Sequence, residues 1–207
     1  MEKKYRLLEN DTITVGCRTL YRIEALKDFA NVKKGDKGGY IESEDNLSHF
    51  GNCWVYGEAE VSENACVYDN ACVCGNALVY GNACVYNNAQ VYGNAQVYDN
   101  AWVYDNAQVY DNAQVYGNAW VYGYAVVFGD ARIRGTVDYY VGKNVWSSGR
   151  YFTYTRSNKM WKVGCFYGTG EELISKAYRD SEVSGREYKR VVEYVEAMYA
   201  DLEKDKE

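Results

Sequence analysis

The sequence predicts a mainly β protein whose central part is a solenoid of parallel strands, and three observations support this fold class. Valine recurs at every sixth position over residues 55–127, and Ile133 continues the series. A small residue stands two places before each of them, Cys53 first and then alanine at every sixth position over residues 59–131. Glycine or aspartate followed by asparagine separates most of these units.

The repeating unit Ala-x-Val-Tyr has the period of two that is typical of a short strand. Alanine and valine then point to one side, and x and tyrosine point to the other. The Gly-Asn and Asp-Asn pairs favour turns, because these residues tolerate positive φ. A helix would need a period near 3.6, and a disordered segment would not need a β-branched residue at every sixth place. We therefore expect a coil with flat sides around a narrow interior of alanine and valine.

This pattern resembles the left-handed parallel β-helix of the hexapeptide-repeat superfamily. In that family an aliphatic residue and a small residue four places later face inward, as Val79 and Ala83 would here. The resemblance covers nearly half of the chain and implies three hexapeptides per coil, so that residues eighteen apart would stack. About five coils, stacked about 4.8 Å apart, would form a prism. The resemblance is specific for the fold and not for a function.

We expect three parts in the chain: an N-terminal β cap over residues 1–40, the hexapeptide solenoid over 41–137, and a C-terminal ββαα module over 138–207. The strands Thr12–Val15 and Thr19–Ala25 are predicted within the cap, because their residues alternate. A cap is expected because the end of a solenoid exposes unpaired strand edges. Residues 39–48 resemble the start of the solenoid in hexapeptide proteins of bacteriophages and prophages, which implies a host setting.

In the C-terminal module, alternation predicts the strands Arg150–Arg156 and Met160–Phe166. Thr169 with Glu172 forms a capping box at the start of one helix, and Ser184 with Glu187 repeats that signature. Apolar residues form one stripe on the second predicted helix, and we expect that stripe to be core: Tyr188, Val191, Val195, Met198 and Leu202.

One face of the predicted prism carries only cysteine, tryptophan and tyrosine outward: Cys66/Tyr68, Cys84/Tyr86, Trp102/Tyr104 and Trp120/Tyr122. Exposed apolar patches and aromatic residues mark contact surfaces, so this face predicts an interface. The alternative is that stacked tyrosines only stabilise adjacent strands. Related hexapeptide proteins are commonly trimers, so the resemblance implies self-association as the first role of this face.

The charge distribution excludes a nucleic-acid groove on the solenoid. The net charge is −6, and 11 acidic residues but no lysine or arginine occur between Lys37 and Arg132. This composition permits a basic partner. Four arginines at or after the end of the repeat are candidate anion contacts, with solvated surface as the alternative: Arg132, Arg134, Arg150 and Arg156.

Nothing in the sequence predicts a catalytic or metal site. Acyltransferases of the superfamily use a histidine as general base, but the only histidine, His49, falls on an inward valine position and is expected to be packed. Cys72 and Cys74 share a strand while Cys66 and Cys84 stack on another face, so no four cysteines converge on zinc. The corner aspartates Asp99, Asp105 and Asp111 lie on different edges of the prism, which disfavours calcium. We expect no cofactor.

We therefore expect a non-catalytic binding and assembly protein, a homotrimer that binds a host or viral protein, with a counter-defence role as the phage resemblance suggests. The alternative is sequestration of a nucleotide-like small molecule at subunit interfaces by stacking and charge. A hexapeptide acyltransferase is a distant third. We expect the cytoplasm of a bacterial host and no membrane contact, because Met1–Arg22 resembles no signal peptide, no long apolar run occurs, and the seven cysteines form no disulfide framework.

Overall fold

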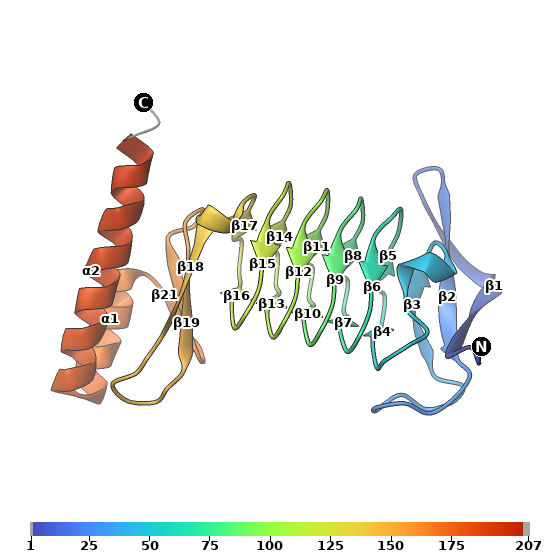
Figure 1. The fold of residues 1–207 in the computed structure, drawn as a ribbon, viewed down its shortest axis with the longest axis horizontal. Coiled ribbons are helices and arrows are strands. Elements are labelled where there is room, and N and C mark those ends of the chain that lie inside the picture. Colours follow the sequence, from blue (N-terminus) through green and yellow to red (C-terminus); the bar gives the residue numbers. More distant parts are fainter. Residues whose placement is uncertain (1, 205–207) are drawn as a thin grey trace. The chain divides into compact units, whose positions relative to one another are not determined.

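The structure is a computed structural model that describes residues 2–204. The chain divides into two compact units, Met1–Thr136 and Val137–Glu207. The first unit holds an N-terminal cap and the solenoid, and the second holds a small sheet with two helices (Figure 1).

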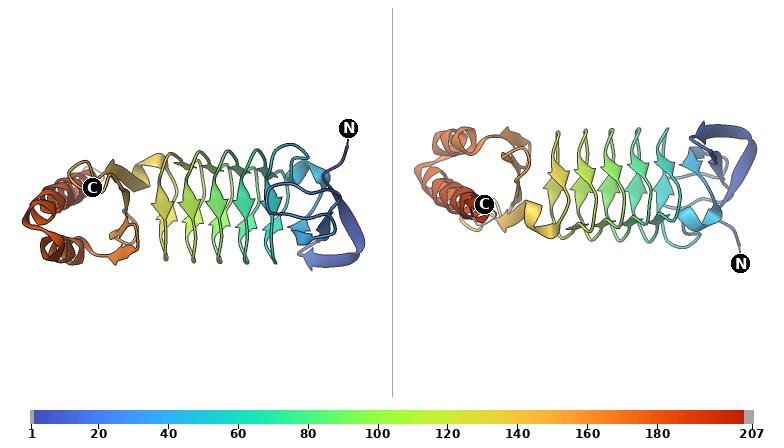
Figure 2. Two further views of the ribbon diagram at one scale, coloured as in Figure 1. Left: turned by 90° about the horizontal axis from the view of Figure 1, so that it is seen from below. Right: turned by 90° about the horizontal axis from the view of Figure 1, so that it is seen from above.

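The solenoid consists of two-residue strands, one for each hexapeptide, arranged as three walls (Figures 1 and 2). The first wall has the order β16 (Val126–Val127), β13 (Gln108–Val109), β10 (Gln90–Val91), β7 (Cys72–Val73), β4 (Trp54–Val55). The second has β5 (Glu60–Val61), β8 (Leu78–Val79), β11 (Gln96–Val97), β14 (Gln114–Val115), β17 (Arg132–Ile133). The third has β15 (Trp120–Val121), β12 (Trp102–Val103), β9 (Cys84–Val85), β6 (Cys66–Val67).

Strand pairing confirms the expected register of eighteen residues. Val91 pairs in parallel with Val73 on one side and with Val109 on the other. Every repeat valine and alanine is buried, because both side chains fill the interior of the coil. The mainly β solenoid is therefore confirmed, while the hand of the coil stays a prediction.

The corners adopt the backbone conformation that their residue types favour. Asp99, Asp105 and Asp111 have φ values of 58°, 58° and 59°, and Gly93 has a φ of 73°. This left-handed region is open to glycine and is tolerated by aspartate and asparagine. The Gly-Asn and Asp-Asn pairs are therefore the turns that the sequence predicts.

The cap continues the second wall. The strands β1 (Tyr5–Val15), β2 (Arg18–Ala25) and β3 (Lys37–Ile41) pair antiparallel in that order, and β3 pairs in parallel with β5. The first strand begins well before the predicted Thr12, because Tyr5 pairs with Ala25 across a register shift in the hairpin. The cap thus supplies hydrogen-bond partners to one edge of the first coil.

The first coil departs from the predicted register. After the short 3-10 helix η1 (Glu44–Asn46), Leu47 bridges Val67 and is fully buried. The prediction that His49 takes this inward position is wrong, because two extra residues lie between Leu47 and Val55. Leu47 pairs with Val67, twenty residues later, whereas Val55 pairs with Val73, eighteen residues later. Trp54 is also not an exposed outward residue, since Phe29 of the cap packs edge-on against its ring at 5.3 Å.

The second unit has a four-stranded antiparallel sheet where the sequence predicted two strands. Its order is β18 (Tyr139–Lys143), β19 (Tyr151–Thr155), β20 (Met160–Val163), β21 (Phe166–Gly168), and the 3-10 helix η2 (Thr136–Asp138) precedes it. The two added strands are the outer ones. β18 lacks clear alternation, and β21 begins at Phe166, the last residue of the predicted strand Met160–Phe166, so that strand is in fact divided between β20 and β21. Pairing with β19 and β20 is what reveals the two outer strands.

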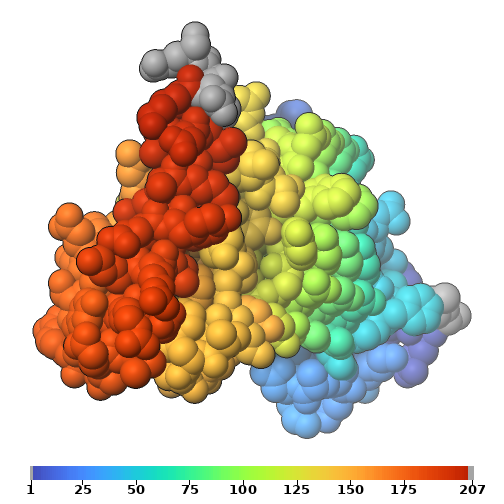
Figure 3. All heavy atoms as spheres, turned by 60° about the vertical axis from the view of Figure 1, so that its left-hand side comes forward, coloured from blue at the N-terminus to red at the C-terminus, as the bar shows by residue number. Residues whose placement is uncertain are grey.

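The helices α1 (Gly170–Asp180) and α2 (Glu182–Lys204) follow the sheet, and Figure 3 shows one side of them as solvent-exposed surface in orange and red. The capping box of Thr169 and Glu172 is confirmed. A second box at Ser184 is wrong, because α2 has already begun and the Ser181 hydroxyl accepts the Ser184 N–H at 3.1 Å. No helix in residues 2–204 is long and apolar enough to cross a membrane.

The core of the second unit lies between the sheet and the helices. Phe152, Tyr154 and Trp161 of the sheet pack with the buried helix residues Leu173, Ala177, Tyr188, Val192, Val195 and Tyr199. The predicted stripe on α2 is therefore only partly right, since Val192 and Tyr199 are buried while Leu202 is 41% exposed. Gly185 allows close packing of the helices, because a Cβ there would lie 2.2 Å from the Tyr178 ring.

Candidate functional site

The candidate site is the outward face of the third wall, which we call the aromatic wall. One of its two rows contains Cys66, Cys84, Trp102 and Trp120, and the other contains Tyr68, Tyr86, Tyr104 and Tyr122. The rows form because parallel strands pair in a register of eighteen residues. Trp102, for example, pairs with Cys84 on one side and with Trp120 on the other. The structure therefore brings all six predicted interface residues onto one face.

The two tryptophans form the most exposed apolar part of this wall. Their ring centroids lie 5.6 Å apart with an interplanar angle of 17°, so the indoles stack. Trp102 is 39% exposed and Trp120 is 47% exposed, and the neighbouring Tyr122 is 43% exposed. Adjacent parallel strands hold the rings in one orientation, which lowers the entropy that binding would have to remove.

The tyrosine row is a continuous stack and carries no charge. Successive centroids from Tyr68 through Tyr86 and Tyr104 to Tyr122 lie 4.8, 5.0 and 5.3 Å apart. Burial raises the pKa of Tyr68, Tyr86 and Tyr104, so these phenols stay neutral at physiological pH. The tyrosine row thus adds a continuous aromatic surface without Asp, Glu, Lys or Arg side chains.

Tyrosine stacking by itself does not distinguish this wall. Tyr80, Tyr98 and Tyr116 stack on the second wall at 5.0 and 5.2 Å, and Tyr92 stacks on Tyr110 of the first wall at 4.5 Å. Tyrosine stacks therefore stabilise the coils on all three walls, as cross-strand aromatic pairs do. The tryptophan pair is what sets the aromatic wall apart, because the equivalent positions in the same coils of the other walls carry glutamine.

The corner residues have structural partners. Asparagine side chains bond from coil to coil, as Asn82 Nδ2 does to Asn100 Oδ1 at 2.9 Å. The Asp99 carboxylate accepts the Gly117 N–H at 3.0 Å, and Asp105 accepts the Gly123 N–H at 3.2 Å. Within residues 2–204 no group of three or more histidine, cysteine, aspartate or glutamate side chains is placed to hold a metal ion.

His49 is held by packing and hydrogen bonds. Its ring stacks on Tyr5 at 4.3 Å, its Nδ1 accepts the Lys4 N–H at 3.2 Å, and its Nε2 lies 3.4 Å from a Glu44 oxygen. The side chain is only 17% exposed. Both ring nitrogens thus have partners within the cap, which leaves no nitrogen directed at a substrate.

The four candidate arginines do not form one cluster. Arg132 and Arg134 are exposed and belong to the first unit, at its last coil. In the second unit, Arg150 lines a cavity of about 460 Å³ together with Lys176. Arg156 instead lies over the Tyr199 ring at 5.9 Å, and its Nε lies 3.5 Å from a Glu203 oxygen.

Sequence reasoning missed a second cavity in this unit, whose volume is about 350 Å³. Tyr154, Glu196 and Tyr199 line it. These residues come from β19 and α2, which are far apart in the sequence, so no spacing could have indicated the cavity. The only available signal was the acidic composition of the last helix.

The comparisons with known proteins concern the repeat alone. Five overlapping stretches match the YdcK beta solenoid repeat: residues 77–93, 89–105, 95–111, 107–123 and 113–129. No curated protein matches the chain. The matched residues lie within the three walls of parallel strands described above. The central part of this chain is therefore a β-solenoid repeat similar to that of YdcK.

Proposed function

We propose that this chain is a non-catalytic binding and assembly protein, and that its aromatic wall packs against a second copy of the chain. The observation that carries the proposal is the stacked and exposed pair Trp102 and Trp120. Tryptophan is the residue most enriched among the energetically dominant positions of interfaces. Packing against another protein would remove this apolar surface from water.

The shape of the wall favours self-association as the first form of assembly. A flat wall without formal charge can meet the same wall of another copy without burying an unpaired charge. The homotrimer that the superfamily resemblance implies is one closed arrangement of such contacts. A host or phage partner, a counter-defence role and a cytoplasmic location are further parts of the proposal, and they rest on the sequence resemblance and composition.

The contacts of His49 support the non-catalytic part of the proposal. A general base needs a nitrogen within hydrogen-bond reach of the reacting group. Lys4 and Glu44 occupy the two ring nitrogens of His49, and Tyr5 covers its face. Acyl transfer would need another base, and within residues 2–204 the structure provides no other histidine.

The double variant Trp102→Gln/Trp120→Gln tests the assembly. Glutamine already occupies the equivalent outward position at Gln90, Gln96, Gln108 and Gln114, so the solenoid tolerates it. We expect wild-type oligomers and a largely monomeric double variant in sedimentation velocity. Each lost tryptophan should weaken association about tenfold or more, because such residues contribute about 2 kcal/mol or more.

The matched control is Gln90→Ala/Gln108→Ala, which shortens two outward side chains at the same register on the first wall. This control should keep the wild-type mass and the wild-type circular dichroism spectrum. A monomeric wild-type protein at high concentration would contradict self-association. An unchanged mass for the tryptophan variant would show that the oligomer uses another surface.

Arg150 favours a second candidate function, the binding of a small anionic molecule. Its guanidinium has no ion-pair partner in residues 2–204, and it lines the 460 Å³ cavity with Lys176 and the buried Ser184. A cavity of this size suits a small ligand. This cavity lies within the second unit. The alternative predicted from the sequence instead placed a nucleotide-like ligand at the interfaces between subunits.

Native mass spectrometry of the purified protein separates the two candidates. An oligomer whose mass equals that of its protein chains supports self-association and contradicts anion binding. A small mass that leaves on denaturation, and that is lost in Arg150→Gln but kept in the exposed-cation control Lys189→Gln, supports anion binding.

A further inference from the structure

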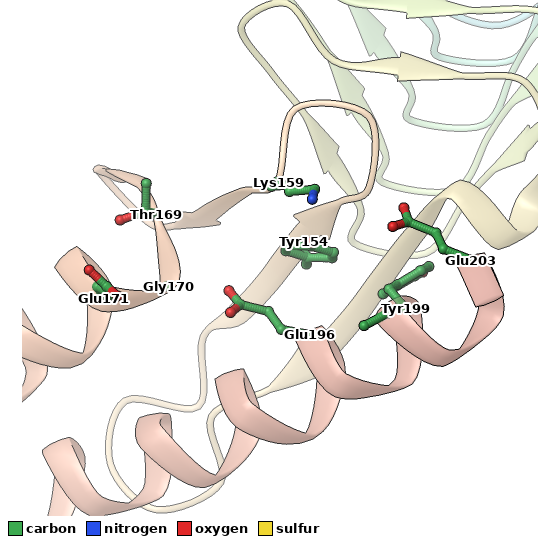
Figure 4. A pocket seen from close by; sticks show the side chains of 9 residues that line it. Tyr154, Lys159, Thr169, Gly170, Glu171, Glu196, Tyr199 and Glu203 are labelled. Atoms are coloured by element: carbon green, nitrogen blue, oxygen red, sulfur yellow. The ribbon is translucent and has the colours of Figure 1, made fainter.

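The second cavity of the C-terminal unit has a composition that no part of the proposed function uses. Its volume is about 350 Å³, and it lies beside the turn between β19 and β20, the start of α1 and the last turns of α2 (Figure 4). The residues that decide its chemistry are Tyr154, Tyr199, Glu171, Glu196, Glu203 and Lys159.

Two largely buried tyrosine side chains have accessible hydroxyls at this cavity that no protein group bonds in the described residues. Tyr154 is 3% exposed and Tyr199 is 5% exposed, and both line the cavity. In the described part of the chain neither phenolic oxygen takes part in a hydrogen bond, although both rings pack in the core. Buried polar groups are almost always hydrogen-bonded in folded proteins. The two phenolic oxygens are not sealed in the core, so they are open to a hydrogen bond from a molecule that enters the cavity.

The electrostatics of the cavity favour a cation. Burial, and then the charges of Glu196 and Glu203, raise the pKa of Tyr154 to about 12, and burial is also the main cause that raises the pKa of Tyr199 to about 12. Both phenols are thus neutral near pH 7 and can accept hydrogen bonds through oxygen. Three carboxylates and one lysine among the lining residues leave a net negative charge.

Two of the three carboxylates, Glu196 and Glu203, are positioned by contacts with other side chains. Trp161, which is fully buried, donates its Nε1–H to Glu196 Oε1 at 3.0 Å. This bond fixes the headgroup of Glu196 beside Tyr154 at the cavity wall, as Figure 4 shows. Glu203 is held more weakly by Arg156, whose Nε lies 3.5 Å away.

From this arrangement we infer that the cavity binds a primary alkylammonium group, carried by a free diamine or by a lysine side chain of another polypeptide. An ammonium has three N–H donors and no acceptor. The carboxylates supply acceptors only, and each neutral phenol adds an oxygen that can accept while its own O–H donates elsewhere, so the site offers acceptors for the three N–H groups. The tyrosine rings contact the methylene stem of the ligand and add cation–π attraction.

The positive charge of Lys159 opposes the binding of an ammonium group in this cavity. It sits on the turn between β19 and β20, lines the cavity, and has no ion-pair partner in residues 2–204. Its φ of 56° marks a tight turn that holds the residue at the rim. A bound ammonium would meet the positive charge of Lys159, so removal of this charge should strengthen binding.

Isothermal titration calorimetry of the full chain with cadaverine and with a blocked lysine derivative tests the inference. We expect saturable binding of at least one of the two amines and none of the uncharged diol analogue of cadaverine. Binding of cadaverine alone assigns a free diamine, and binding of the lysine derivative alone assigns a polypeptide side chain. Absence of binding by both amines at low ionic strength would overturn the inference.

Three variants locate the binding. Glu171→Gln/Glu203→Gln should weaken binding about tenfold or more, because two charge-assisted partners are lost. Lys159→Gln should tighten it several-fold, an effect that misfolding cannot produce. The control Glu193→Gln removes an exposed charge on α2 that does not line this cavity, and it should bind as the wild type does. Equal loss in the control, or no gain in Lys159→Gln, would show nonspecific attraction and overturn the site.

Discussion

Cys66 and Cys84 share a row with the two tryptophans, and their sulfur atoms lie 3.0 Å apart on adjacent coils. The period of eighteen residues predicts this neighbourhood, because both cysteines occupy the same outward position. The effect of this contact on the two pKa values depends on side-chain geometry, which the sequence pattern does not specify. A hydrogen bond from Cys66 stabilises the thiolate of Cys84 and lowers the pKa of Cys84 to about 7, while the pKa of Cys66 is raised.

We predict that Cys84 is alkylated faster near pH 7 than the exposed Cys17 and Cys165, because its lowered pKa increases its thiolate fraction. In Cys66→Ala the hydrogen bond is lost, the pKa of Cys84 rises, and its labelling near pH 7 should slow several-fold. Peptide mass mapping after timed iodoacetamide treatment measures these rates, with Cys66→Ala made in the Trp102→Gln/Trp120→Gln background so that no second copy covers the wall.

Cys74 is the internal control for that experiment. Its pKa is lowered to about 7 by its own neighbour Cys72, so its rate should stay constant in Cys66→Ala. If Cys84 reacts equally fast in the wild type and the variant, the hydrogen bond does not govern its reactivity.

At the scale of elements, local signals predicted some boundaries and missed others. Thr169 caps α1 as expected, because its hydroxyl accepts the Glu172 N–H at 3.3 Å and Glu172 bonds back to the Thr169 N–H at 2.8 Å. The start of α2 was misplaced because both Ser181 and Ser184 are suitable N-caps. In the structure α2 begins at Glu182, directly after Ser181, and Gly185 within its first turns packs closely against the Tyr178 ring.

We predict that Thr169→Ala lowers the free energy of unfolding of the second unit by about 1 kcal/mol, through loss of the N-cap. Chemical denaturation followed by the helical circular dichroism signal measures the change. Ser175→Ala, an exposed substitution within the same helix, is the control and should change stability by a few tenths of a kcal/mol at most. Equal effects of the two variants would contradict the capping role.

At the scale of the whole molecule, the two units have separate cores. Alanine and valine fill the interior of the solenoid, whereas Trp161 lies at the centre of the second core and packs against Phe152 and Tyr154 at 6.0 and 5.0 Å. The sequence predicted a change of architecture near residue 137, and the chain divides between Thr136 and Val137. Separate cores should give separate unfolding equilibria.

We predict that Trp161→Ala destabilises the second unit by about 3–5 kcal/mol, the cost of truncating a buried aromatic side chain. Hydrogen exchange followed by mass spectrometry should show faster exchange in peptides after Val137 and unchanged protection in the solenoid. Val103→Ala, in the solenoid interior, should show the reverse pattern. Joint loss of protection in both units would contradict their independence.

The sequence by itself determined the solenoid, its inward residues, its corners and the composition of the aromatic wall. A period of six places the same residue types at the same position of every coil, so local pattern and tertiary contact coincide. Only the tertiary structure decided that the cap covers Trp54, that Leu47 replaces His49 inside the first coil, and that Tyr154 and Tyr199 share a cavity with Glu196. These features depend on contacts between segments distant in the chain, and such contacts leave no periodic trace in the sequence.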